Sequence, residues 1–230
     1  MADRTNTIWP QKGKPTLALL TASAGFISAL LSASIVYYPI WLHRFSFFPG
    51  TVFGAVVSIS WALGGYLHSL WKIVVITAAA TFAYYLSFLA AGAVEMHFVQ
   101  SKDGSISSLA LFVGGLTGAV FVLCSMLFQF DSEIPWQRRL LTALRWSPVG
   151  AILGILGWAL GPFVGMSVWF VVHALGLTIP TETSQNAHGE TSHMYSLWVV
   201  WQTGMGGLLG LLLHSGMRRK VERAFRSLAE

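Results

Sequence analysis

The sequence predicts an all-α integral membrane protein built as a bundle of six transmembrane helices. Two observations carry this prediction: six long apolar runs divide the chain of 230 residues, and the basic residues between the runs fall almost entirely on one side. Each run has about 17–27 residues, close to the roughly 20 that a helix needs to cross the hydrocarbon core. The six runs are residues 16–37, 51–67, 73–94, 107–128, 148–174 and 195–213.

The charge pattern orients the predicted bundle. If the N-terminus lies in the cytoplasm, the inner side holds all but two of the 14 Lys and Arg residues, and the outer side holds only Arg44 and Lys102. Cytoplasmic loops carry such an excess because basic segments resist translocation. We therefore expect both termini inside, a location in the cytoplasmic membrane, and anionic lipids as partners of the inner face.

The composition excludes an ordinary soluble domain. Hydrophobic residues make up 54% of the chain and charged residues only 10%, and the mean hydropathy is +0.63. An isoelectric point of about 9.6 would suggest nucleic acid as the partner of a soluble protein. Here the basic inner loops account for it, so we expect no nucleic acid partner.

The predicted organisation has three parts. Residues 1–15 form a polar cytoplasmic lead-in, residues 16–214 the transmembrane domain, and residues 215–230 a basic amphipathic cytoplasmic helix. The two lysines before the first run, together with its apolar stretch, also fit a signal peptide. The apolar stretch continues to Tyr38, which is longer than a usual signal core, so we expect it to remain as the first span.

The connections between the runs differ in character. Residues 37–50 are rich in aromatic side chains, which predicts that they lie along the outer interface. Residues 68–72 form a tight inner turn, so the second and third spans are expected to be antiparallel neighbours. Residues 131–146 mix basic and apolar residues at helical spacing, which predicts a separate helix in the inner interface. Residues 176–194 form a long hydrophilic outer loop.

Small residues recur every four positions on most spans, a pattern that favours close helix packing in lipid. Within these spans, a Trp-Ala-Leu-Gly tetrapeptide begins at Trp61 and recurs at Trp158. This recurrence is a candidate for a 3+3 inverted repeat, a design typical of transporters and channels; the alternative is coincidence between apolar segments. Gly161 and Pro162 inside the fifth run predict a helix break.

The mid-depth polar residues of the spans are neutral, since no Asp, Glu, Lys or Arg lies there. Their neutrality argues against a proton-coupled pump and favours a neutral, amphipathic or apolar ligand. For each polar residue alone, an interhelical hydrogen bond is the competing explanation. The predicted ligand-binding residues, taken from the polar centre, the repeated tetrapeptide and the helix break, are Tyr84, Tyr85, Gln202, Trp61, Trp158 and Gly161.

The leading functional hypothesis is a membrane protein that binds or passes a small neutral or amphipathic solute across the cytoplasmic membrane. It acts as a transporter or channel, or as a membrane subunit of one with a protein partner. The sequence contains no His-Glu-x-x-His, Gly-x-Ser-x-Gly or Gly-Lys-Ser/Thr motif, so we expect no enzyme activity and no cofactor.

Two other hypotheses stay open at this point. One is a haem-bearing redox subunit, because imidazole is an axial ligand of haem iron; the outer loop also offers weak ligands for a transition metal. The other is a scaffold or assembly protein without catalysis. The haem candidates are His68, His214, His97 and His173, and the metal candidates are His188, Glu190 and His193.

Overall fold

The computed structural model describes residues 14–35, 47–67, 69–99, 107–130, 135–165 and 196–215, with single residues between 166 and 174. Over these ranges the protein is all-helical and no strand occurs. Four helices are long and apolar enough to cross a membrane: Leu70–His97, Ser108–Met126, Trp136–Ala159 and Ser196–Ser215. Such helices are compatible with a polytopic membrane protein.

The helices follow the predicted runs with ends shifted by a few residues, except in the fifth run. Two further helices contain the shorter apolar stretches Leu17–Ser32 and Phe48–Leu63. The elements are α1 (Lys14–Ile35), α3 (Phe48–Leu63), α4 (Leu70–Val94), the π-helix η1 (Glu95–Val99), α5 (Ser108–Phe130), α6 (Trp136–Ala159), the π-helix η2 (Gly161–Gly165) and the helix Ser196–Ser215.

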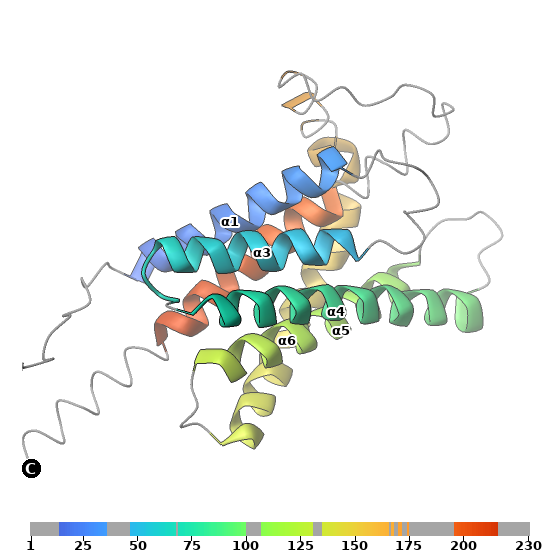
Figure 1. Ribbon diagram of the computed structural model, residues 1–230. Coiled ribbons are helices and arrows are strands. Elements are labelled where there is room, and N and C mark those ends of the chain that lie inside the picture. The colour runs from blue at the N-terminus through green and yellow to red at the C-terminus, as the bar shows by residue number, and fades with distance from the viewer. Residues whose placement is uncertain are drawn as a thin grey trace, which may run out of the picture.

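Figure 1 shows α3 and α4 side by side and the helix Ser196–Ser215 next to α1. The start of α1 and the end of Ser196–Ser215 lie at the same end of the bundle (Figure 1). The turn between α3 and α4 contains Gly65, whose φ of 76° suits glycine. The two helices pack as antiparallel neighbours, as the short predicted connection required.

Small residues bring the helices into backbone contact. A Cβ on Gly54 would lie 2.7 Å from the Cα of Thr77 on α4. A Cβ on Gly115 of α5 would lie 2.6 Å from the carbonyl oxygen of Gly150 on α6. A Cβ on Gly206 would overlap the carbonyl oxygen of Thr21 on α1. Lipid provides no hydrophobic drive between helices, so close approach of this kind holds them together.

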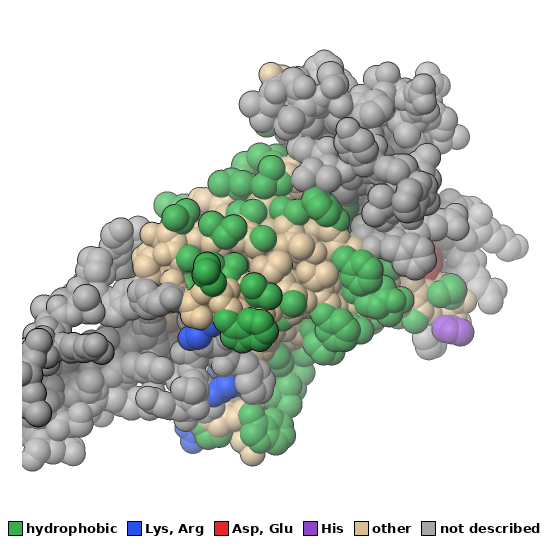
Figure 2. Space-filling view, in the orientation of Figure 1, with side chains coloured by type: hydrophobic (Ala, Val, Ile, Leu, Met, Phe, Trp, Pro, Cys, Tyr) green, Lys and Arg blue, Asp and Glu red, His purple; other side chains and the backbone are tan. Residues whose placement is uncertain are grey.

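The charges of the described residues separate along the bundle. Figure 2 shows Lys and Arg side chains at one end and acidic and His side chains at the other. Lys72 lies in the first turn of α4, and Arg138, Arg139 and Arg145 lie in the first half of α6. This end is called the basic end below. The opposite end carries Glu95, the only acidic residue in the described ranges, and is called the Glu95 end.

The prediction of a separate interfacial helix at residues 131–146 was wrong. Residues from Trp136 onward are the first turns of α6, which runs without interruption through Pro148. Proline removes the hydrogen bond to the carbonyl four residues earlier, which here belongs to Leu144. The hydroxyl of Ser147 donates to that carbonyl oxygen at 2.8 Å. This local bond replaces the lost one and lets the helix continue.

The fifth run breaks where the sequence predicted. Helix α6 ends at Ala159, and the π-helix η2 begins at Gly161. The related tetrapeptide also ends a helix, because α3 stops at Leu63 with Gly64 as its cap. Both copies of the Trp-Ala-Leu-Gly sequence therefore terminate an apolar helix. The aromatic connection, the outer loop 176–194 and the basic C-terminal helix lie mostly or wholly outside the described residues.

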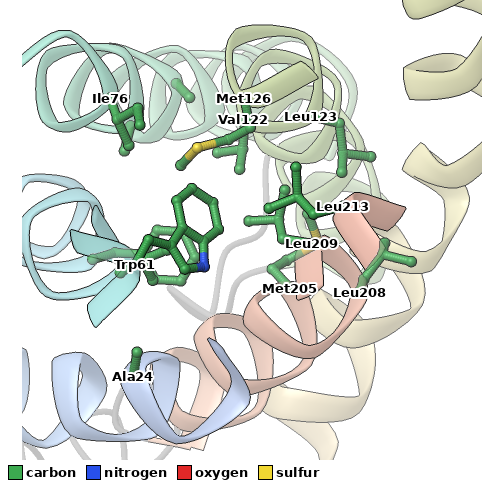
Figure 3. Close-up of a cluster of buried hydrophobic side chains, with 14 of the residues drawn as sticks. Ala24, Trp61, Ile76, Val122, Leu123, Met126, Met205, Leu208, Leu209 and Leu213 are labelled. Atoms are coloured by element: carbon green, nitrogen blue, oxygen red, sulfur yellow. The ribbon is translucent and has the colours of Figure 1, made fainter. Parts of the chain in front are cut away.

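A dense cluster of buried apolar side chains fills the basic half of the bundle. Trp61 is fully buried at its centre. Figure 3 shows its indole between Ile76, Val122 and Met126 on one side and the helix carrying Met205 and Leu209 on the other. The cluster is called the basic-end core; besides these residues it contains Leu17, Ala24, Phe53, Val57, Leu67, Ala80, Ala83, Ala119, Leu123, Ala143, Leu208 and Leu213.

Candidate ligand cavity

A cavity of 270 Å³ lies between α4, α5, α6 and the first turns of the helix Ser196–Ser215. It is lined mainly by apolar and aromatic side chains, with a few polar groups among them. Ligand sites in proteins have this composition. The lining residues are Tyr84, Ser87, Phe88, Ala91, Gly92, Glu95, Ala110, Leu111, Gly114, Gly115, Gly154, Leu197, Trp198, Trp201 and Gln202.

One face of α4 and its π-helical continuation forms the longest wall. The lining residues from Tyr84 through Phe88 and Ala91 to Glu95 recur every three or four positions, which places them on one side of a helix. The eleven residue steps from Tyr84 to Glu95, at about 1.5 Å each, give this wall a length of roughly 16 Å. A Cβ on Gly92 would meet no atom within 4 Å. The cavity therefore has room at Gly92 for a larger side chain.

The polar groups beside the cavity mostly bind one another. The indole Nε1 of Trp198 donates to the hydroxyl oxygen of Tyr84 at 3.0 Å. The hydroxyl of Ser87 donates to the carbonyl oxygen of Gly114 at 2.6 Å and ties α4 to α5. These bonds fix the walls and leave surfaces that are chiefly apolar.

Gln202 closes the cavity on the side of the basic-end core. Its side chain is buried, and its Oε1 accepts a hydrogen bond from the Ser28 hydroxyl on α1 at 2.6 Å. Its Nε2 lies 3.5 Å from the carbonyl oxygen of Pro49 at the start of α3. Beside it, Trp201 packs edge-on against Phe53 of the core, with ring centroids 6.1 Å apart. The Gln202 amide thus joins three helices at the inner limit of the cavity.

Glu95 marks the other limit of the cavity. Its Oε2 accepts hydrogen bonds from the backbone N–H of Ser107 at 3.0 Å and from the Ser107 hydroxyl at 2.8 Å. Ser107 in turn accepts from the N–H of Ala110 at the start of α5. The carboxylate is therefore held at a helix N-terminus, where a negative charge is stabilised. It also begins the π-helix η1, a distortion frequent at functional sites.

The structure brings two of the six predicted site residues together, Tyr84 and Gln202, which both line the cavity. Tyr85 instead packs against Phe47, with ring centroids 4.8 Å apart. Trp61 belongs to the basic-end core. Trp158 lies in the last turn of α6 and Gly161 in η2, and neither lines the cavity.

Sequence reasoning missed Ser87, Glu95, Trp198 and Trp201 as lining residues. Glu95 directly follows the third predicted run, but its place beside an apolar space depends on how α4 and α5 pack. The two tryptophans carried a signal, because their spacing of three puts both on one helix face. That spacing is equally typical of a lipid-facing helix, so it did not single them out.

The histidine hypotheses fall partly outside the described residues, which do not include His68, His173 or the outer-loop candidates. His97 lies in η1 at the Glu95 end, and His214 lies near the end of the helix Ser196–Ser215, at the basic end. The haem hypothesis pairs His97 with His173 and His214 with His68, and each of these partners lies outside the described residues. Within the described ranges, no three His, Cys, Asp or Glu side chains gather where they could hold a metal ion.

Compared with protein-family models, curated proteins and solved structures, the chain gives no match in any of the three.

Proposed function

We propose that this protein is a six-span membrane protein, with both termini in the cytoplasm, that binds a small neutral or amphipathic solute in the cavity. The observation that carries the proposal is a 270 Å³ apolar space inside a helical bundle. A cavity of about 150 Å³ lined by aliphatic and aromatic side chains is enough to bind benzene. The present one suits a ligand of about two rings or a short alkyl chain.

The arrangement of charge supports the proposed orientation. The described Lys and Arg residues of α4 and α6 share one end, and excess basic charge marks cytoplasmic loops. The cavity then lies in the outer half of the bundle, with Glu95 toward the outside. The basic-end core lies between the cavity and the cytoplasm.

Passage of the solute across the membrane is the second part of the proposal. It requires the basic-end core to open, since that core is filled by large side chains such as Trp61, Met126 and Met205. The 3+3 inverted repeat would provide the conformation in which the basic-end core is open, because two inverted halves can exchange conformations. The matching helix ends after Trp61 and Trp158 support this reading.

The binding proposal is tested by filling the cavity. Gly92→Leu places a side chain into open space on the wall, so the protein is expected to fold normally and lose ligand binding. Ala93→Leu is the matched control, because Ala93 is exposed on the same helix and lies outside the cavity. Binding of the neutral probe β-naphthylmethanol is measured by calorimetry in lipid nanodiscs, with empty nanodiscs subtracted.

We expect one saturable site in the wild type and in Ala93→Leu, and at least tenfold weaker binding in Gly92→Leu, a change of roughly 1.4 kcal/mol. Wild-type protein that takes up no more probe than empty nanodiscs would refute the proposal. So would undiminished binding in Gly92→Leu.

A further inference from the structure

The geometry points to a ligand with a positive charge: an amphipathic cation whose apolar body fills the cavity and whose ammonium group lies against Glu95. This inference rests on the proposed function and specifies its ligand class. It combines three features of the cavity: a carboxylate at one limit, aromatic walls, and an elongated apolar interior.

The first feature is the fixed carboxylate. Glu95 is anchored through Oε2 to the N–H and hydroxyl of Ser107, so its position beside the cavity is set before any ligand binds. A carboxylate in apolar surroundings interacts more strongly with a cation than it would in water. It repels an anionic group for the same reason. The described Lys and Arg residues lie in the opposite half of the bundle.

The second feature is the aromatic wall. Four of the lining residues are aromatic: Tyr84, Phe88, Trp198 and Trp201. The same rings provide contact area for an apolar body. Tyr84 lies about 16 Å from Glu95 along the helix, and Trp198 is bonded to Tyr84, so these rings receive the apolar body of the ligand while the carboxylate binds its charged group.

The third feature is the shape. The carboxylate lies at one end of the α4 wall and Tyr84 at the other, about 16 Å apart along the helix. The interior between them is apolar, and its deepest polar group, the Gln202 amide, is already bonded to Ser28. A ligand that fits both ends has one charged group and an apolar remainder.

The test compares three probes that share one ring system and differ in charge. They are β-naphthylmethylammonium, β-naphthylmethanol and β-naphthoate, measured against the wild type in nanodiscs of neutral lipid. We expect the ammonium probe to bind about tenfold or more tightly than the alcohol, and the carboxylate probe to bind most weakly. This comparison uses only the wild-type protein, so misfolding of a variant cannot affect it.

The assignment to Glu95 is tested with two variants. Glu95→Gln keeps an acceptor for Ser107 and removes the charge, so the ammonium and alcohol probes are expected to bind about equally, within roughly twofold. Ser107→Ala removes one of the contacts to Glu95 and keeps the charge, so the preference is expected to remain.

Equal binding of all three probes to the wild type would overturn this inference and leave the proposed function intact. If Glu95→Gln still prefers the ammonium probe over the alcohol, the cation binds elsewhere and the assignment to Glu95 is wrong. Failure of every probe to bind above the empty-nanodisc level would refute the inference and the proposed function together.

Discussion

The two halves of the bundle use the same helices in opposite ways. On α5 the cavity residues run from Ala110 to Gly115, and the core residues begin at Ala119. The other helices divide at the same level. On α4 the core ends at Ala83 and the cavity begins at Tyr84, whereas on Ser196–Ser215 the cavity residues end at Gln202. One half is filled by large apolar side chains, and the other leaves a space between them.

Glycine shows the difference most clearly. Gly206 has α1 backbone where its Cβ would be, whereas Gly92 has open space. Gly206 therefore serves close packing, as Gly115 does on the opposite wall of the cavity, whereas Gly92 leaves space on the α4 wall. The comparison teaches that a glycine-rich apolar helix can close a bundle and hollow it within one fold.

The largest effect on the free energy of unfolding is expected from removing a large side chain from the basic-end core. Trp61→Ala removes a fully buried side chain and should lower the free energy of unfolding by roughly 3–5 kcal/mol. Trp71→Ala, on a side chain that is 71% exposed, is the matched control and should change it little. Titration of SDS into mixed micelles measures both. Equal losses would show that the basic half is no more tightly packed than the surface.

Adding a methyl group is expected to change stability differently at Gly206 and at Gly92. Gly206→Ala pushes the helix Ser196–Ser215 away from α1 and should cost about 1–3 kcal/mol. Gly92→Ala, the same change beside the cavity, should be neutral or stabilising by up to about 1 kcal/mol, since alanine favours helices over glycine. Thermal unfolding in detergent gives both values. If Gly92→Ala costs as much as Gly206→Ala, the contrast between the halves is wrong.

The smallest effect is expected in the cavity wall. Tyr84→Phe leaves the Nε1 of Trp198 without its acceptor on α4, at a cost of about 1 kcal/mol. Tyr85→Phe keeps the ring contact with Phe47 and should have no measurable effect. The emission spectrum of the tryptophans reports the change at Trp198. A larger effect from Tyr85→Phe than from Tyr84→Phe would show that the polar side of the cavity wall lies at Tyr85 and not at Tyr84.

The helices were predictable because length and apolarity alone define them. The division of each helix into core, cavity and outer face was not, since these helices are apolar on all sides. Tyr84 and Tyr85 illustrate the limit: consecutive helical residues differ by about 100° in direction, and only the position of α5 and Ser196–Ser215 decides which one faces the cavity. The separate helix predicted at residues 131–146 was wrong for another reason: α6 continues through Pro148 because the Ser147 hydroxyl binds the carbonyl that proline leaves without its usual hydrogen bond.

The contact between the first and last helices also affects the order of events during synthesis. Ser28 and its partner Gln202 are 174 residues apart, so at roughly 5–20 residues per second α1 waits on the order of ten seconds for its neighbour. During that interval its three buried hydroxyls have acceptors within α1: Thr21 donates to Leu17, Ser32 to Ser28, and Ser28 to the Gly25 carbonyl at 2.7 Å. When Gln202 arrives, Ser28 needs only to turn its hydroxyl. In the six-span arrangement proposed above, the first helix can thus remain in lipid with these three hydroxyls satisfied until the last helix is made.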